Sequence, residues 1–164
     1  MELLLPIVIV ILLITLTTLA FVMKRSGKEV DFPYRKNVYF MSQAERDFFH
    51  VLQRVVPERF YIFSQVSLNN LLLVDRGRKD YMHHFNRIRQ KSVDFVLVDK
   101  SSMTTTLAIE LDDRSHNYPD RIRRDEMVNE AFRAAGLPLL RITNQRTYDE
   151  RTVQRTIEEN VHGH

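Results

Sequence analysis

Two short apolar runs, VDFVLV at residues 93–98 and LAIELDD at residues 107–113, decide the fold of this chain. Both have the composition of buried β-strands, and both carry acidic residues among the apolar ones. Because side chains alternate between the faces of a strand, Glu110 and Asp112 share one face and their apolar neighbours take the other. Asp94 interrupts the first run in the same way. An unpaired buried charge is costly, so we expect these three carboxylates to share a counter-ion.

A divalent cation is the simplest counter-ion for such a cluster. Mg²⁺ usually takes one or two carboxylates and completes its coordination with water and substrate phosphate. We therefore predict that Asp94, Glu110 and Asp112 are ligands of Mg²⁺ or Mn²⁺. The chemistry indicated is metal-dependent hydrolysis of a phosphodiester.

The elements around these two runs predict an α/β sandwich built on a small mixed sheet. A capping-box pattern opens a helix at Ser42, and Gly136 follows the end of another helix. The strand, helix and strand over residues 107–142 imply a parallel strand pair. The predicted elements are a helix over 42–56, a strand over 61–68, a helical turn over 71–74, the two acidic strands, a helix over 118–135, a strand over 139–142 and a helix from about 149.

The acidic pattern and the element order resemble the restriction-endonuclease-like, or PD-(D/E)XK, nuclease superfamily. More narrowly, the motifs at residues 93–95, 110–116, 124–125 and 139–142 resemble an uncharacterised bacterial domain family within it. That family often follows an N-terminal membrane span, and very-short-patch-repair endonucleases are more distant relatives. The resemblance covers nearly all of residues 41–161 and implies a three-layer nuclease fold acting on nucleic acid, DNA first.

One position departs from the superfamily pattern. Its third catalytic residue is usually a lysine that helps to activate water, and this chain has Asp112 there. Relatives with this change use a downstream histidine, which makes His116 the candidate for proton transfer. Glu45 fits the third position of the capping box, and it also resembles the first-helix glutamate that points towards the metal in relatives. Both roles of Glu45 remain open.

Basic side chains concentrate just before the first acidic strand, with histidine and aromatic residues between them. Such a segment suits a nucleic-acid backbone, since neutralised phosphates release counter-ions. A solvated loop, or attraction to anionic lipid, is the alternative. The predicted nucleic-acid-binding residues are Arg76, Arg78, Lys79, Arg87, Arg89, Lys91 and, from a later strand, Arg141.

The N-terminal segment is apolar and uncharged over residues 3–23, close to the ~20 residues that cross a membrane. A cleaved signal peptide is the alternative, although the apolar run is long and no basic residue precedes it. Lys24, Arg25 and Lys28 follow at once, which favours a cytoplasmic C-terminal side. We therefore predict an anchor at 1–23, a tether at 24–41 and a domain at 42–161, at a bacterial inner membrane.

Composition narrows the function less than the motifs do. The chain has no cysteine, which excludes disulfides and thiolate metal sites, and its formal net charge of +3 is mild. Two functions follow: a membrane-tethered, Mg²⁺-dependent nuclease, or a non-catalytic module with the same fold that binds nucleic acid or protein. The missing lysine favours the second.

Overall fold

The computed structural model describes residues 4–25, 32–112 and 119–162. The chain divides into two compact units, Met1–Val38 and Tyr39–His164. His116, the predicted proton-transfer residue, lies outside the described residues.

The first unit contains helix α1, Leu4–Arg25. The hydroxyls of Thr15, Thr17 and Thr18 donate hydrogen bonds to backbone carbonyls of the preceding turn, which accounts for these polar residues in an apolar helix. Apolar side chains are exposed along the helix. No helix within the described ranges combines the length and the apolarity needed to cross a membrane. The anchor inferred from the sequence therefore stays a prediction.

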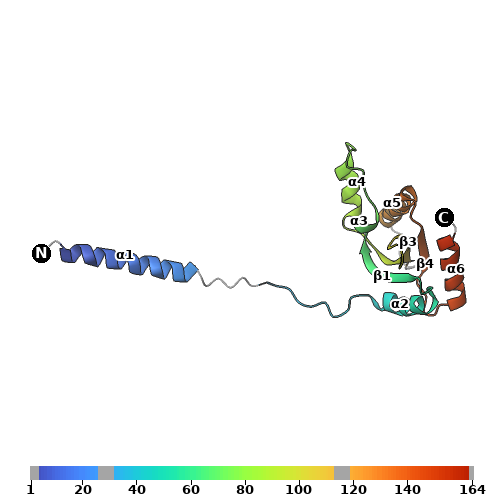
Figure 1. Cartoon of the computed structure of the whole chain (residues 1–164), viewed down its shortest axis with the longest axis horizontal. Helices are drawn as coiled ribbons and strands as arrows, with labels where there is room; N and C mark the ends of the chain where they lie inside the picture. The colour runs from blue at the N-terminus through green and yellow to red at the C-terminus, as the bar shows by residue number, and fades with distance from the viewer. Residues whose placement is uncertain (1–3, 26–31, 113–118, 163–164) are drawn as a thin grey trace. The chain divides into compact units, whose positions relative to one another are not determined.

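The second unit is built on one four-stranded sheet in the order β1-β2-β3-β4 (Figure 1). Its strands are β1 Phe60–Ser67, β2 Ser92–Asp99, β3 Thr105–Asp112 and β4 Leu139–Thr143. The first two pairings are antiparallel, and β3 and β4 are parallel. Helix α5, Pro119–Ala135, makes the crossover between the parallel strands. The predicted mixed sheet and parallel pair are thus confirmed.

Helices cover both faces of this sheet, because each face presents apolar side chains. On one face, α2 (Gln43–Val55) and α6 (Glu150–His162) bury Phe48, Leu52 and Ile157 against Phe95 and Leu97. On the other face, α3 (Leu68–Leu71), α4 (Tyr81–Ile88) and α5 pack against a second cluster that includes Val93, Val96 and Phe132. The unit is therefore an α/β protein with a mixed sheet between two helical layers (Figure 1). This agrees with the predicted α/β sandwich on a small mixed sheet.

Local signals placed most element boundaries. Ser42 and Glu45 form the capping box of α2, and Gly136 ends α5 with a φ of 68°. On the inner face of α2, Phe48 is fully buried and Phe49 only partly. The helical turn expected at 71–74 lies earlier, at 68–71, because Leu68 fills the second core cluster.

The basic segment contains a helix that the sequence pattern did not indicate. In α4, the rings of Tyr81 and Phe85 stack at 5.6 Å, and Ile88 is buried. These contacts at helical spacing give the segment an inner face. The basic side chains thus stand on a helix and its flanks.

Candidate functional site

The candidate site forms where strand β2 breaks its alternation. Phe95 packs with α2 and α6, but Val93, two residues earlier, packs in the opposite cluster. Strict alternation would put both on one face. The register pairs Ser64 with Phe95 and Val66 with Val93, so Gln65 stands level with Asp94 on the neighbouring strand. Gln65 has a φ of 55°, a left-handed conformation that non-glycine residues rarely adopt within a strand.

Asp94 also marks the point where β2 and β3 separate. Their last register pair on this side is Phe95 with Ile109. Beyond it, the Asp94 carboxylate accepts a hydrogen bond of 2.7 Å from the backbone N–H of Leu111. Strand β3 continues beside β4 as far as Thr143. We call the resulting group of side chains, Glu45, Asp94, Glu110 and Asp112, the acidic fork.

The two central carboxyl groups of the fork resist ionisation together. Asp94 and Glu110 are half-buried and hydrogen-bond to each other. Burial, with repulsion from Asp94 and Asp112, raises the pKa of Glu110 to about 8. Burial also raises the pKa of Asp94, against the opposing effect of the Leu111 N–H. The pair therefore retains a proton at neutral pH, as expected for two carboxyl groups without a full counter-charge.

Glu45 takes part in the capping box of α2 and also lies beside the acidic fork, the two roles that the sequence left open. Its carboxylate accepts a 2.7 Å hydrogen bond from the backbone N–H of Ser42, which completes the capping box. It also lies close enough to Asp94 for its charge to raise the pKa of that residue. The capping role thus holds Glu45 beside the fork, and the two readings are compatible.

Asp112 forms an ion pair with a cation from the neighbouring strand. Strand β4 runs parallel to β3 and places Arg141 level with Glu110. The Arg141 guanidinium lies 2.6 Å from Asp112 and 3.9 Å from Asp125, and its Nε donates to Asn129 Oδ1 at 2.9 Å. Arg141 lowers the pKa of Glu110, against the larger effect of burial. Arg141 was grouped with the nucleic-acid contacts, and the fold places it at the acidic fork.

As they stand, no three His, Asp or Glu side chains in the described part of the chain are arranged to hold a metal ion. Arg141 engages Asp112, and burial raises the pKa of both Asp94 and Glu110. Asp94 and Glu110 by themselves match the two carboxylates that Mg²⁺ commonly uses. A cation there would replace the shared proton, so the fork fits a two-carboxylate site better than the predicted three-carboxylate one.

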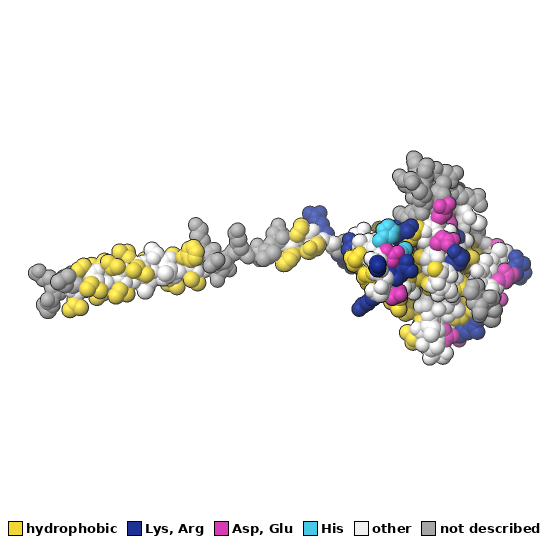
Figure 2. All heavy atoms as spheres, turned by 90° about the horizontal axis from the view of Figure 1, so that it is seen from above, with side chains coloured by type: hydrophobic (Ala, Val, Ile, Leu, Met, Phe, Trp, Pro, Cys, Tyr) yellow, Lys and Arg dark blue, Asp and Glu magenta, His cyan; other side chains and the backbone are white. Residues whose placement is uncertain are grey.

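The remaining predicted nucleic-acid residues surround α4, and acidic neighbours interrupt their charge. Arg78 makes a bidentate contact with Asp80 at 2.8 and 2.9 Å, and His84 lies 2.9 Å from the same carboxylate. Arg78 and His84 hydrogen bonds lower the pKa of Asp80. Histidine, basic and acidic side chains are intermingled on the face shown in Figure 2. Arg78 is exposed, as are Arg76, Lys79, Arg87 and Arg89, and Lys91 is half-buried.

Sequence reasoning listed Arg141 as a nucleic-acid contact and did not place it beside Asp112. That position follows from the β3–β4 register, which the predicted parallel pair made accessible in principle. The left-handed backbone of Gln65 has no sequence signal.

Fold and site together define a mixed α/β domain with a protonated carboxyl pair at a fork in its sheet. Residues 37–161 match the family described as "Protein of unknown function (DUF2726)", and the chain belongs to that family. No curated protein and no solved structure matches this chain significantly.

Proposed function

We propose that this protein is a metal-dependent nuclease that hydrolyses phosphodiester bonds in nucleic acid, with DNA as the first substrate to test. The observation that carries the proposal is the half-buried, hydrogen-bonded pair of Asp94 and Glu110 in the acidic fork, where burial raises the pKa of both carboxyl groups. Strongly perturbed carboxyl groups gathered at one point are a mark of functional sites. Stability alone would favour apolar residues in their place.

In this proposal Asp94 and Glu110 hold a Mg²⁺ or Mn²⁺ ion. The bound ion would lower the pKa of a water molecule and offset charge on the scissile phosphate. Glu45 keeps the fork negative from the side of α2, which favours a cation over the shared proton. Asp112 stands next to the pair but is already neutralised by Arg141.

Arg141 also bears on the missing lysine. The superfamily lysine would place a positive charge beside the metal carboxylates, and Arg141 supplies one from the neighbouring strand. A guanidinium contacts phosphate well but does not release its proton near neutral pH. Proton transfer is therefore assigned to His116, on the sequence argument alone.

The fold is compatible with the proposed superfamily. In chain order α2, β1, β2, β3, α5 and β4 follow the α-β-β-β-α-β core expected from the resemblance, with α3 and α4 inserted after β1. Fold does not determine function, so this order supports the proposal only by analogy.

A second function, binding of nucleic acid or protein without catalysis, rests on a different observation. Asp112 occupies the lysine position and is held by Arg141, so that position offers no free cation. A domain of this kind would keep the fold and bind beside a membrane without cleaving anything.

Cleavage assays separate the two functions. The full chain in neutral detergent is incubated with plasmid and single-stranded substrates in Mg²⁺, Mn²⁺ or EDTA. We expect cleavage that EDTA stops and that Asp94→Asn with Glu110→Gln abolishes. Asp99→Asn, at the other end of the same strand, is the matched control and retains activity. Binding without cleavage under every metal condition would favour the second function.

We also propose that residues 3–23 tether the domain to the inner membrane, with the domain in the cytoplasm. The uncharged run, the basic residues that follow it and the exposed apolar side chains of α1 support this location. Fractionation with alkaline extraction of the full chain, and a C-terminal reporter active only in the cytoplasm, test it. Full release of the protein by alkaline extraction would contradict the tether.

A further inference from the structure

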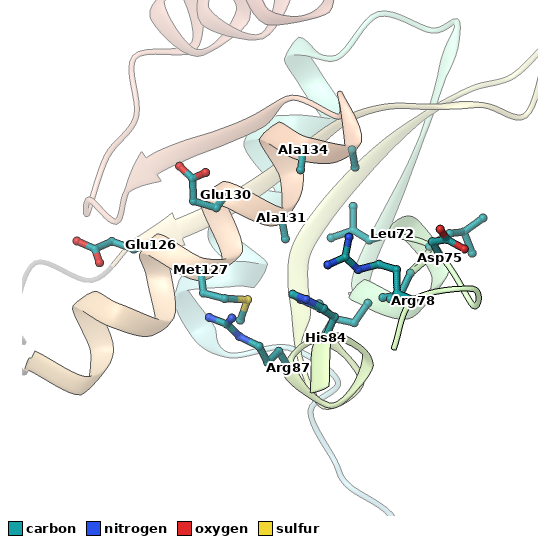
Figure 3. A pocket seen from close by; sticks show the side chains of 14 residues that line it. Leu72, Asp75, Arg78, His84, Arg87, Glu126, Met127, Glu130, Ala131 and Ala134 are labelled. Atoms are coloured by element: carbon teal, nitrogen blue, oxygen red, sulfur yellow. The ribbon is translucent and has the colours of Figure 1, made fainter. Parts of the chain in front are cut away.

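A groove lies between α4 and α5 on the sheet face opposite α2 and α6. Its volume is about 650 Å³, and the side chains around it are shown in Figure 3. Leu72 and Ile88 form a buried apolar floor, and Met127 and Ala131 of α5 form one wall. The small side chains of Ala131 and Ala134 leave the α5 wall open to close approach by another chain. We call this feature the α4–α5 groove.

Charged side chains of both signs line the groove, and some of them are paired while others are not. Arg78 and Glu130 are engaged, by Asp80 and Arg133 respectively. Arg87 on the α4 wall and Glu126 on the α5 wall have no hydrogen bond or ion pair with another described residue. The groove therefore presents one available cation and one available carboxylate on facing walls.

An exposed apolar side chain stands at the same groove. Leu73 lines it and is 96% exposed, the highest value among the described large apolar residues. Next to it in the chain, Leu72 is buried in the floor. A fully exposed leucine beside an apolar cavity resembles a contact from which the partner is missing.

We propose that a second copy of this chain occupies the α4–α5 groove in a two-fold symmetric dimer. Leu73 of each copy enters the groove of the other, and Arg87 of each copy pairs with the partner's Glu126. A two-fold interface must be self-complementary, and a groove with its own apolar projection and both signs of charge meets that requirement. A phosphate ligand fits less well, because Asp75, Glu126 and Glu130 all line the groove.

The proposed interface leaves the acidic fork accessible. Asp125 and Asn129 of α5 contact Arg141, whereas Glu126, Met127, Glu130 and Ala131 line the groove. The two sets lie on different sides of one helix. Dimer formation and nuclease activity are therefore independent, and failure of one leaves the other standing.

Charge exchange tests the dimer. Full-length chains carrying two different tags are co-expressed, and capture through one tag is scored for the other in detergent. We expect wild-type chains to capture each other. Arg87→Glu with itself, and Glu126→Arg with itself, should each reduce capture about tenfold, because each creates two like-charge pairs. Arg87→Glu with Glu126→Arg should restore capture, because both pairs are then of opposite sign.

The apolar contact has its own variant and control. Leu73→Asp should reduce capture about as strongly, whereas Met103→Asp, at another exposed apolar residue outside the groove, should not. Arg155→Glu on α6 controls for an unspecific charge effect. Unchanged circular dichroism excludes misfolding. Equal capture in every combination, or loss with no restoration in the exchanged pair, would overturn the proposal.

Discussion

Strand β2 carries an aspartate near each end, and the two carboxylates meet opposite surroundings. Asp94 is half-buried in the acidic fork, where burial raises its pKa. Asp99 receives hydrogen bonds from the backbone N–H and the hydroxyl of both Ser101 and Ser102, and these lower its pKa to about 2. The two residues flank the same apolar run, Phe95 to Val98, so each is an aspartate beside apolar strand residues in the sequence.

The difference teaches how to separate a structural carboxylate from a functional one. Asp99 stabilises a turn, and its charge is satisfied by four donors from two adjacent serines. Asp94 has one backbone donor, Leu111, and carboxyl neighbours. A carboxylate without its own counter-charge is the one that has use for a cation.

The largest expected effect concerns proton transfer near the fork. If the fork end of β2 is catalytic, His116→Ala should lower turnover by about 10²–10⁴-fold, the range typical of general acid–base catalysis. Metal and nucleic-acid binding should change little. His50→Ala, at an exposed histidine of α2, is the control. A fully active His116→Ala protein would leave water activation to the metal alone.

The next effect is the response of stability to metal. At a Mg²⁺ concentration about 100 times its Kd, the wild type should gain about 2.7 kcal/mol of unfolding free energy, because the ion binds only the folded state. Asp94→Asn with Glu110→Gln should remove this gain and leave the metal-free protein at least as stable at pH 8. Asp99→Asn should keep the full gain. Thermal melts with Mg²⁺ and with EDTA measure it, and a response retained in the double variant would sink the proposed site.

Stability without metal should fall as pH rises through the window between the ordinary glutamate pKa and about 8. In this window the folded protein binds more protons than the unfolded chain. The stability contributed by protonated Glu110 is therefore fully present below the pKa that Glu110 has in the unfolded chain, and it is lost as pH rises through the pKa that Glu110 has in the folded protein. The slope is at most about 1.4 kcal/mol per pH unit for one group. Asp99 has the opposite sign, and its contribution is lost as pH falls towards about 2. Urea unfolding of wild type and Glu110→Gln across pH 4–9 resolves the first effect, and a flat wild-type profile contradicts it.

A smaller change in the pH dependence of stability is expected when Arg141, the cation beside the fork, is replaced. Arg141 lowers the pKa of Glu110, so Arg141→Gln should raise it further and move the loss of stability to higher pH. Arg141→Lys should keep most of the wild-type profile in the absence of metal, because it preserves the charge. Asp112→Lys, which restores the usual superfamily residue, places two cations together and should weaken stability. No shift of the pH profile in Arg141→Gln would mean that Arg141 acts on Asp112 alone.

The smallest effect compares the left-handed residues near the two ends of β2. Gln65, level with Asp94, has a φ of 55°, and Met103, in the turn after Asp99, has a φ of 57°. Glycine relieves this strain, so Gln65→Gly and Met103→Gly should each stabilise by roughly 0.5–1 kcal/mol in urea unfolding. Only Gln65→Gly should also weaken the response to Mg²⁺, because Gln65 alone adjoins the fork. Equal metal responses would make the strain at Gln65 unrelated to the site.

The sequence by itself determined the element order apart from α4, the mixed sheet and the membership of Asp94, Glu110 and Asp112 in one acidic group. These features depend on local patterns: alternation in the strands, the capping box at Ser42 and the glycine after α5. A residue's neighbours along the chain are enough to decide each of them. The placement of Glu45 at a helix start followed in the same way, although its distance from Asp94 did not.

Only the tertiary structure decided what each carboxylate of the fork meets. Arg141 lies 29 residues after Asp112, and Glu45 is on a helix that reaches Asp94 only when α2 packs on the sheet. The break in face alternation at Asp94 lies level with the left-handed residue Gln65 on the neighbouring strand, and no single strand pattern records this pairing. Burial and Coulomb interactions depend on distances in space, so the pKa of Glu110 and the pairing of Asp112 could not be read from sequence spacing.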